Sequence, residues 1–436
     1  LPLKWSMWLL GPSILLATGI VPTLWLPLAP VFPGANIAGL LSVVGLDCIF
    51  NIGAMLFLLM ADACGRPRES STSSAVGSRI PLRYKLWNIG ASALSFLVPL
   101  LLLLPSCKST LRPQLPFNSL MVLLGPYLLL LSIQMLTEML TWHWRSPVWL
   151  VAPIVYEGYR VLQLMRGISM AGEVRAPAWM VDCLCWLVMW WVLILGIQLM
   201  HVASFAGLQD RSEKIEFMSD EATGKLPLKW PMWLLGPSIL LATGVVPTLW
   251  LPLSSVFLGP NIAGVLSLIG LDCIFNMGAM LFLLMADACG RPKESSTSCA
   301  VGSQIPLRYK LWNMGASVLG FLVPLVLLFA SCKSTLQPHL PFNSFMVLLG
   351  PYLLLLSIQM LTEMLTWHWR SPVWLVAPVV YEGYRVLQLM RGISLAGEIS
   401  APAWMVESLR GLVTWWILIL GIQLMRVAWL AGLPYR

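Results

Sequence analysis

The chain has 436 residues, of which 58% are hydrophobic and only 11% are charged, and its mean hydropathy is +0.80. A soluble chain of this size would carry about a quarter charged residues, so the composition indicates a protein of the lipid bilayer. The net charge of +8 comes from Lys and Arg in short loops between apolar runs. That distribution is a topology signal, and it argues against nucleic acid as a partner.

The sequence repeats itself without an insertion, at the offset that separates Asp47 from Asp272. The segment LPLKWPMWLLGPSILLATG from Leu226 follows LPLKWSMWLLGPSILLATG from Leu1. The two copies agree at about five positions in six, which indicates a recent tandem duplication. We therefore predict a membrane repeat at 1–208, a polar linker at 209–225 and a second membrane repeat at 226–436.

The linker contains Met218 followed by SDEATGK, a polar stretch of the kind that opens a short membrane protein. Two interpretations follow from this. The segment is either a true linker within one polypeptide, or the junction of two neighbouring genes joined in one product.

Each repeat contains a series of long apolar segments, and a transmembrane helix needs about 20 such residues. In the first repeat the segments are 8–26, 37–61, 86–104, 120–142 and 179–200, with an ambiguous one at 148–165. Pro12 and Pro22 predict a kink in the first segment. The expected fold class is all-α: a polytopic membrane helix bundle built from two near-identical tandem repeats of five to six transmembrane helices, which associate with each other in the bilayer.

The segment 148–165 decides between five and six spans per repeat, because its first half is apolar and its second half is polar. It either crosses the bilayer or lies in the interface. Counting Lys and Arg on each side favours five spans. For one continuous chain, six spans are preferred, because they give both copies the same orientation as parallel repeats.

Asp47 lies near the middle of the second apolar segment, where a carboxylate costs roughly 2.5 to 3.5 kcal/mol. Asn51 follows one helical turn later and is the expected hydrogen-bond partner. The functional interpretation is a cation or proton site, repeated at Asp272 and Asn276. The structural interpretation is a buried polar clamp between helices.

Polar residues also follow one stripe of the fourth segment. Tyr127, Leu131, Gln134, Glu138 and Thr141 have the spacing of one helix face, which is expected to face the bundle. Gln134 and Glu138 would continue a polar path from Asp47, and Gln359 and Glu363 would do so in the second repeat. The alternative for Glu138 is a salt bridge with Arg145 at the membrane interface.

Three further sites have structural explanations. Glu157 and Arg160 are three residues apart and are expected to neutralise each other in a segment that enters lipid. Asp182, whose counterpart is Glu407, lies at the start of the last segment, where the helix dipole favours a carboxylate. His143 lies between two tryptophans in the interfacial belt and has no metal-site spacing.

No catalytic motif is present: the sequence lacks GxSxG, Walker A and GxGxxG patterns, and its nine cysteines form no CxxC pair. We therefore expect no enzyme, no cofactor and no metal. The predicted protein is an integral membrane transporter or channel for a small solute or an ion, with a polar intramembrane path. The alternative is a non-catalytic membrane scaffold or assembly protein.

Overall fold

The computed structural model describes residues 2–22, 37–66, 82–107, 116–144, 146–215, 230–250, 259, 261–290, 307–332, 340–369 and 371–431. Over these ranges every regular element is a helix. The chain divides into two compact units. Unit 1 comprises Leu1–Gln198 with Leu424–Tyr435, and unit 2 comprises Leu199–Gln423 with Arg436.

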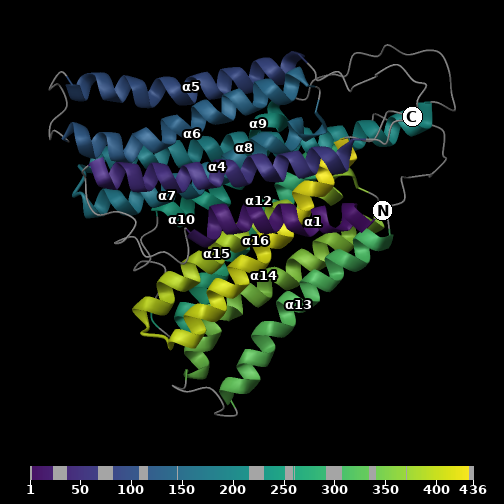
Figure 1. The fold of residues 1–436 in the computed structure, drawn as a ribbon. Helices are drawn as coiled ribbons and strands as arrows, with labels where there is room; N and C mark the ends of the chain where they lie inside the picture. The colour runs from purple at the N-terminus through teal and green to yellow at the C-terminus, as the bar shows by residue number, and fades with distance from the viewer. Residues whose placement is uncertain are drawn as a thin grey trace. The chain divides into compact units, whose positions relative to one another are not determined.

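The helices follow the same order in the two halves of the chain (Figure 1). The first half contains α1 (Pro2–Leu15), a π-helical turn (Leu16–Ile20), α4 (Ile37–Gly65), α5 (Leu82–Cys107), α6 (Phe117–His143), a 3-10 turn (Pro147–Leu150), α7 (Val151–Glu173) and α8 (Ala178–Ile215). The second half contains α9 (Trp230–Leu240), a π-helical turn (Leu241–Val245), α10 (Val246–Trp250), α12 (Ile262–Gly290), α13 (Leu307–Cys332), α14 (Phe342–His368), a 3-10 turn (Pro372–Leu375), α15 (Val376–Glu398) and α16 (Ala403–Ala431).

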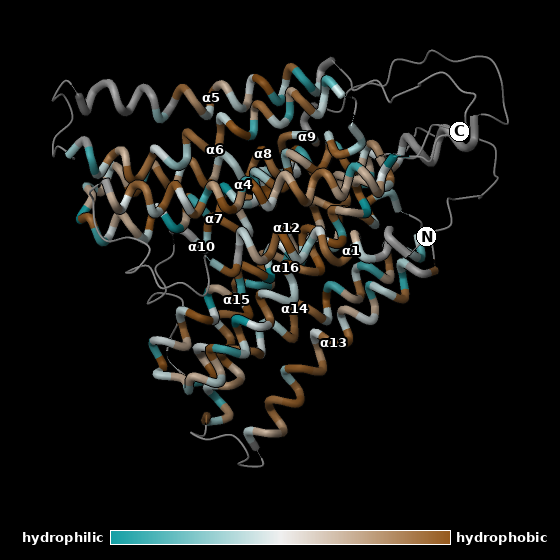
Figure 2. Tube along the Cα trace, viewed as in Figure 1, coloured by the Kyte–Doolittle hydropathy of each residue, from teal (hydrophilic) through white to brown (hydrophobic). Residues whose placement is uncertain are grey.

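Among the described residues, seven helices are long and apolar enough to cross a bilayer: α4, α6, α8, α12, α13, α14 and α16. Their exposed faces are apolar as well. On α4 the exposed side chains include Ile49, Ile52, Met55, Leu56 and Leu59. Figure 2 shows hydrophobic residues along the helices of both units. Because water would disfavour such surfaces and lipid would not, these helices belong to an integral membrane protein.

In unit 1, α4 packs against α1, α6 and α7, and α6 packs against α5 and α7. The contact of α4 with the π-helical turn that follows α1 is close at Gly53, where an added Cβ would lie 1.8 Å from Oγ1 of Thr18. Instead of a simple proline kink, the first segment contains the π-helical turn, which begins one turn after Pro12. Proline has no N–H to donate, so a change in the helical ladder near it is expected.

The ambiguous segment 148–165 forms the 3-10 turn and most of α7. Ser146 caps this turn by accepting a hydrogen bond from the Val148 N–H at 3.3 Å. The polar residues in the first half of α7 are buried in the unit, where Glu157 and Arg160 have no exposed surface, whereas Ser169 and Glu173 near its end are exposed. Among the described helices, α7 is not one of those long and apolar enough to cross a bilayer, so whether this segment crosses or lies in the interface stays a prediction. The helix ends at Glu173, and Arg175, two residues beyond, has a left-handed φ of 49°.

The predicted linker begins within a helix, because α8 continues to Ile215. The rest of the linker, including Met218, lies outside the described residues, as does Arg145. The division between units falls within α8 and α16.

Candidate functional site

Asp47 is fully buried on α4, and its carboxylate accepts three hydrogen bonds from α7. Oδ1 accepts from the Tyr159 hydroxyl and from Nη2 of Arg166, each at 2.8 Å, and Oδ2 accepts from Nε2 of Gln163 at 2.6 Å. The contact with Arg166 is an ion pair. We call Asp47 and these three partners the α4–α7 clamp. It compensates the charge that makes a carboxylate costly in mid-span.

The three donors of the clamp come from one stripe of α7, because Tyr159, Gln163 and Arg166 are spaced i, i+4 and i+7. Phe50 on α4 holds the tyrosine ring in place: the two rings stack with centroids 3.5 Å apart and planes 4° apart. The clamp therefore combines an ion pair, neutral hydrogen bonds and an aromatic contact between the same two helices.

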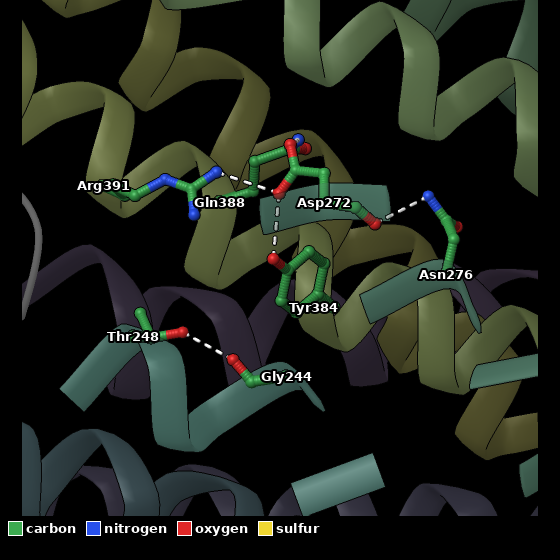
Figure 3. Close-up of polar contacts among 7 residues, drawn as sticks. All are labelled: Gly244, Thr248, Asp272, Asn276, Tyr384, Gln388 and Arg391. Atoms are coloured by element: carbon green, nitrogen blue, oxygen red, sulfur yellow. Dashed lines mark hydrogen bonds and ion pairs between the residues drawn. The ribbon is translucent and has the colours of Figure 1, made fainter. Parts of the chain in front are cut away.

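The same bonds occur in unit 2 around Asp272 on α12 (Figure 3). Its carboxylate accepts from Tyr384 and Arg391 at 2.9 Å each and from Gln388 at 2.5 Å. Asn276 donates to the main-chain carbonyl of Asp272, at 2.9 Å, and not to its carboxylate.

Asn51 makes the corresponding main-chain bond in unit 1, at 2.8 Å to the Asp47 carbonyl. The expectation that Asn51 would pair with the Asp47 side chain is therefore wrong. The amide nitrogen of a buried Asn one turn later can reach the carbonyl of its own helix, and α7 supplies better donors to the carboxylate.

A second polar group joins α5, α6, α7 and α8. Glu138 on α6 accepts from Nε2 of Gln134 at 2.6 Å and from Nδ2 of Asn88 on α5. Gln198 on α8 donates to Oδ1 of Asn88 at 2.7 Å and to Oε1 of Glu157 on α7 at 3.4 Å. All five side chains are buried. Together with Arg160 they are called the central cluster below.

Glu138 is buried, and both of its carboxylate oxygens bond to buried amides. Arg145, its partner in the interfacial alternative, lies outside the described residues, so that salt bridge stays untested. The rest of its predicted stripe is buried with it: Tyr127, Leu131, Gln134 and Thr141. Their spacing places them on the side of α6 that faces α5 and α7, whereas Leu136 and Met139 are exposed.

Arg160 and Glu157 do not pair, contrary to the expectation from their spacing. The three guanidinium nitrogens of Arg160 have no hydrogen-bond partner, and neither has Oε2 of Glu157. The guanidinium carbon lies 4.0 Å from the ring centroid of Trp191 and 5.6 Å from that of Tyr127. The indole of Trp191 also donates to the Tyr127 hydroxyl at 3.0 Å. The cation thus lies against aromatic faces, which stabilise it without satisfying its N–H groups.

The two groups of residues differ in formal charge. In the clamp, the charges of Asp47 and Arg166 cancel. The central cluster contains two carboxylates, Glu138 and Glu157, and one guanidinium, Arg160, so it carries one uncompensated negative charge when all three are ionised. All three side chains are buried. An uncompensated charge at this depth is costly, so the arrangement favours the uptake of a cation.

Corresponding bonds exist in the central cluster of unit 2. Glu363 accepts from Gln359 at 2.6 Å and from Asn313. Gln423 donates to Asn313 at 2.6 Å and to Glu382 at 3.4 Å. The guanidinium of Arg385 lies 4.0 Å from the ring of Trp416 and 5.6 Å from that of Tyr352, and its nitrogens have no hydrogen-bond partner.

The remaining predicted sites lie apart from these groups. Asp182 is exposed at the start of α8, and Glu407 pairs with Arg410 at the start of α16. His143 is exposed at the end of α6. Among the described residues, no three His, Cys, Asp or Glu side chains are grouped so that they could hold a metal ion.

Their spacing predicts that Gln134 and Glu138 share one face of a helix, and their side chains form a hydrogen bond. The spacing does not predict their partners on other helices. Two of these partners are Asn88 and Gln198, which are amides within otherwise apolar segments. Isolated polar residues of this kind indicate buried polar contacts between membrane helices. For the clamp, the signal was the stripe of Tyr159, Gln163 and Arg166. In the part of the chain that the structure describes, no hydrogen bond joins Asp47 to Glu138, and the predicted polar path between them stays a prediction.

The fold and the two polar groups define a polytopic α-helical membrane protein. In comparisons with protein-family models, curated proteins and solved structures, nothing matches this chain. The assignment of function therefore rests on the chemistry of the buried polar residues.

Proposed function

We propose that this protein is a membrane transporter or channel for a small solute or an ion, in which the central cluster takes up a cation. In the simplest case the cation is a proton shared by Glu138 and Glu157. One observation carries the proposal: two carboxylates and one guanidinium are buried together with a net negative charge. No covalent chemistry is assigned to the cluster.

The hydrogen bonds that the carboxylate oxygens of Glu138 already accept favour a proton over a metal cation. Both oxygens of Glu138 already accept hydrogen bonds from amides, which leaves little room for an ion that needs several oxygen ligands. A proton needs only one acceptor, and Oε2 of Glu157 has no partner. The other titratable groups that interact with these carboxylates are the hydroxyls of Tyr84 and Tyr156.

The test is proton entry into proteoliposomes that contain the full chain and a pH-sensitive dye. A potassium diffusion potential, negative inside, drives the protons. Entry is measured without solute and with a defined mixture of amino acids, sugars and short carboxylates. We expect faster entry than in protein-free vesicles in at least one condition. The double variant Glu138→Gln with Glu363→Gln should remove most of this excess rate.

A matched control removes the same number of carboxylates from exposed positions, through Asp182→Asn with Glu407→Gln. The control should keep the rate of the unmodified chain. Equal rates in all chains, or no excess entry under any condition, would overturn the transport proposal.

The second candidate function is a non-catalytic membrane scaffold. It is favoured by the α4–α7 clamp, in which α7 already supplies Asp47 with a counter-charge and two further hydrogen bonds. Under this alternative the buried charges only hold helices together. The glutamine variants would then lower stability without changing proton entry.

A further inference from the structure

The side chain of Arg160 is unusual among buried cations. It has no exposed surface, yet Nε, Nη1 and Nη2 all lack a hydrogen-bond partner. Arg385 repeats this arrangement in unit 2. Buried arginines normally satisfy their N–H groups with carboxylates or carbonyls, because unsatisfied donors cost free energy. The missing partner is therefore expected to be a molecule that binds here.

The aromatic residues fix how such a molecule can approach. Trp191 covers one face of the guanidinium, with 4.0 Å from the ring centroid to the guanidinium carbon. The N–H groups of a guanidinium point outward in its own plane, so a stacked ring leaves them available at the edge. A carboxylate matches that edge with two parallel hydrogen bonds. The bond from Trp191 to Tyr127 holds the ring in position.

The same cluster also contains acceptors without a donor. Oε2 of Glu157, Oε1 of Gln134 and Oε1 of Gln198 are buried and have no partner. They come from α7, α6 and α8, and hydrogen bonds through Glu138 and Asn88 connect their side chains. The unsatisfied acceptors thus lie in one hydrogen-bonded network, and the unsatisfied donors of Arg160 come from the same helix as Glu157, three residues further along α7.

The unsatisfied donors of Arg160 and the unsatisfied acceptors of the central cluster together favour some ligand charges over others. A simple anion would satisfy Arg160 but add negative charge to a cluster that already has an excess of it. A simple cation would satisfy Glu157 and leave the guanidinium without acceptors. A zwitterion presents a carboxylate and an ammonium group together, and it leaves the net charge unchanged.

We propose that the central cluster binds a small zwitterion of the α-amino-acid class. The carboxylate lies against the edge of Arg160, and the ammonium group donates to Glu157 and to the amide oxygens of Gln134 and Gln198. This inference names the substrate of the transport function proposed above and rests on it.

The test is equilibrium dialysis of radiolabelled glycine and L-alanine against the purified full chain in detergent. We expect saturable binding at two sites per chain, one in each unit. Propanoate and ethylamine, which carry only one of the two charges of alanine, should compete at least tenfold more weakly than alanine itself.

Conservative variants locate the sites. Arg160→Lys keeps the charge but loses the planar edge, so binding should fall from two sites to one. Arg160→Lys with Arg385→Lys should weaken binding at both sites at least tenfold. Arg410→Lys, at a residue that pairs with exposed Glu407, is the matched control and should bind like the unmodified chain.

A second pair of variants tests the ammonium side without relying on the arginines. Glu157→Gln with Glu382→Gln should lower the affinity for alanine at least tenfold and raise that for propanoate, because the carboxylate still meets Arg160 and the excess negative charge is gone. Retained propanoate binding also reports that the site is folded.

The proposal is overturned if neither glycine nor alanine binds, or if the double lysine variant binds them as the unmodified chain does. These failures differ from a failure of the transport proposal. Proton entry without amino-acid binding would remove only the substrate assignment. Amino-acid binding without proton entry under any condition would remove the transport function and leave a binding site.

Discussion

Arg166 and Asp47 form a buried ion pair between α7 and α4, with 2.8 Å between Nη2 and Oδ1. They are 119 residues apart in sequence. The pair explains how an aspartate can occupy the middle of an apolar helix, because the neighbouring helix brings the opposite charge. It also makes the clamp sensitive to the loss of either partner.

Removing one partner of this pair should be far worse than removing both. Asp47→Asn or Arg166→Gln alone leaves a buried charge and should cost about 3 to 5 kcal/mol of unfolding free energy. The combined variant should cost clearly less than the sum of the two single changes. Denaturant unfolding in micelles, followed by tryptophan fluorescence, measures all three. Additive costs would show that the two side chains do not interact.

Tyr159 contributes to the clamp in two separable ways, through its hydroxyl and through its ring. Tyr159→Phe removes the bond to Asp47 but keeps the stacking on Phe50, and should cost about 1 to 2 kcal/mol. Tyr159→Ala also removes the ring and should cost about 3 to 5 kcal/mol. Tyr156→Phe is the control, since that hydroxyl lies 3.4 Å from Thr137 and makes only a weak contact. Equal effects of the two Phe variants would contradict the assignment.

Gly53 is required by the close approach of the π-helical turn Leu16–Ile20 to α4. In Gly53→Ala the new Cβ would lie 1.8 Å from Oγ1 of Thr18, so the helices must separate, at a cost of at least about 3 kcal/mol. Thr18→Gly in the same chain should recover part of the loss. Gly45→Ala, where no atom lies within 4 Å, should instead stabilise α4 by about 0.5 to 1 kcal/mol. Thermal melting in detergent gives the sign of each change.

Ser95 marks a difference between the units near the central cluster. Its hydroxyl accepts from Nε1 of Trp190 at 2.7 Å. Unit 2 has Gly320 at the corresponding position, and Nε1 of Trp415 has no partner there. Ser95→Gly should therefore cost about 1 to 2 kcal/mol, from the lost bond and the lower helix propensity. Ser132→Gly, on the exposed side of α6, should cost at most about half as much by the same unfolding measurement.

Arg175, two residues after the end of α7, has a left-handed conformation that an L side chain adopts at a cost. Arg175→Gly should relieve that strain and stabilise unit 1 by about 0.5 to 1 kcal/mol, and Ser400→Gly, where φ is 51°, should do the same in unit 2. A raised melting temperature is the expected result. A lowered one would show that the side chain of Arg175 contributes more than its backbone costs.

Hydrophobic patterning predicted much of the helical architecture. The segments expected at 37–61 and 120–142 are helices at Ile37–Gly65 and Phe117–His143. Burial of the α6 stripe also followed from spacing alone, because a helix in a bundle turns its polar face inward. The predicted segments are shorter than the helices, because each helix continues beyond the apolar residues that define a span.

The partners of the buried charges could not be predicted in the same way. Asp47 meets residues of α7 that are more than a hundred positions away, and only packing determines which polar stripe of α7 meets which helix. The expected Glu157–Arg160 pair failed for a related reason. Spacing permits the contact, but Trp191 and Tyr127 offer the guanidinium an aromatic surface that local sequence rules do not consider.

Both polar groups take residues from the same helix. Tyr159, Gln163 and Arg166 lie on one stripe of α7, and Glu157 and Arg160 lie on the adjacent one. Because a helix turns as a rigid rod, α7 cannot rotate to release Arg160 from Trp191 without also pulling Arg166 away from Asp47. Any such rotation of α7 must therefore break this ion pair, and the strength of the clamp sets the energy needed to move Arg160 away from Trp191.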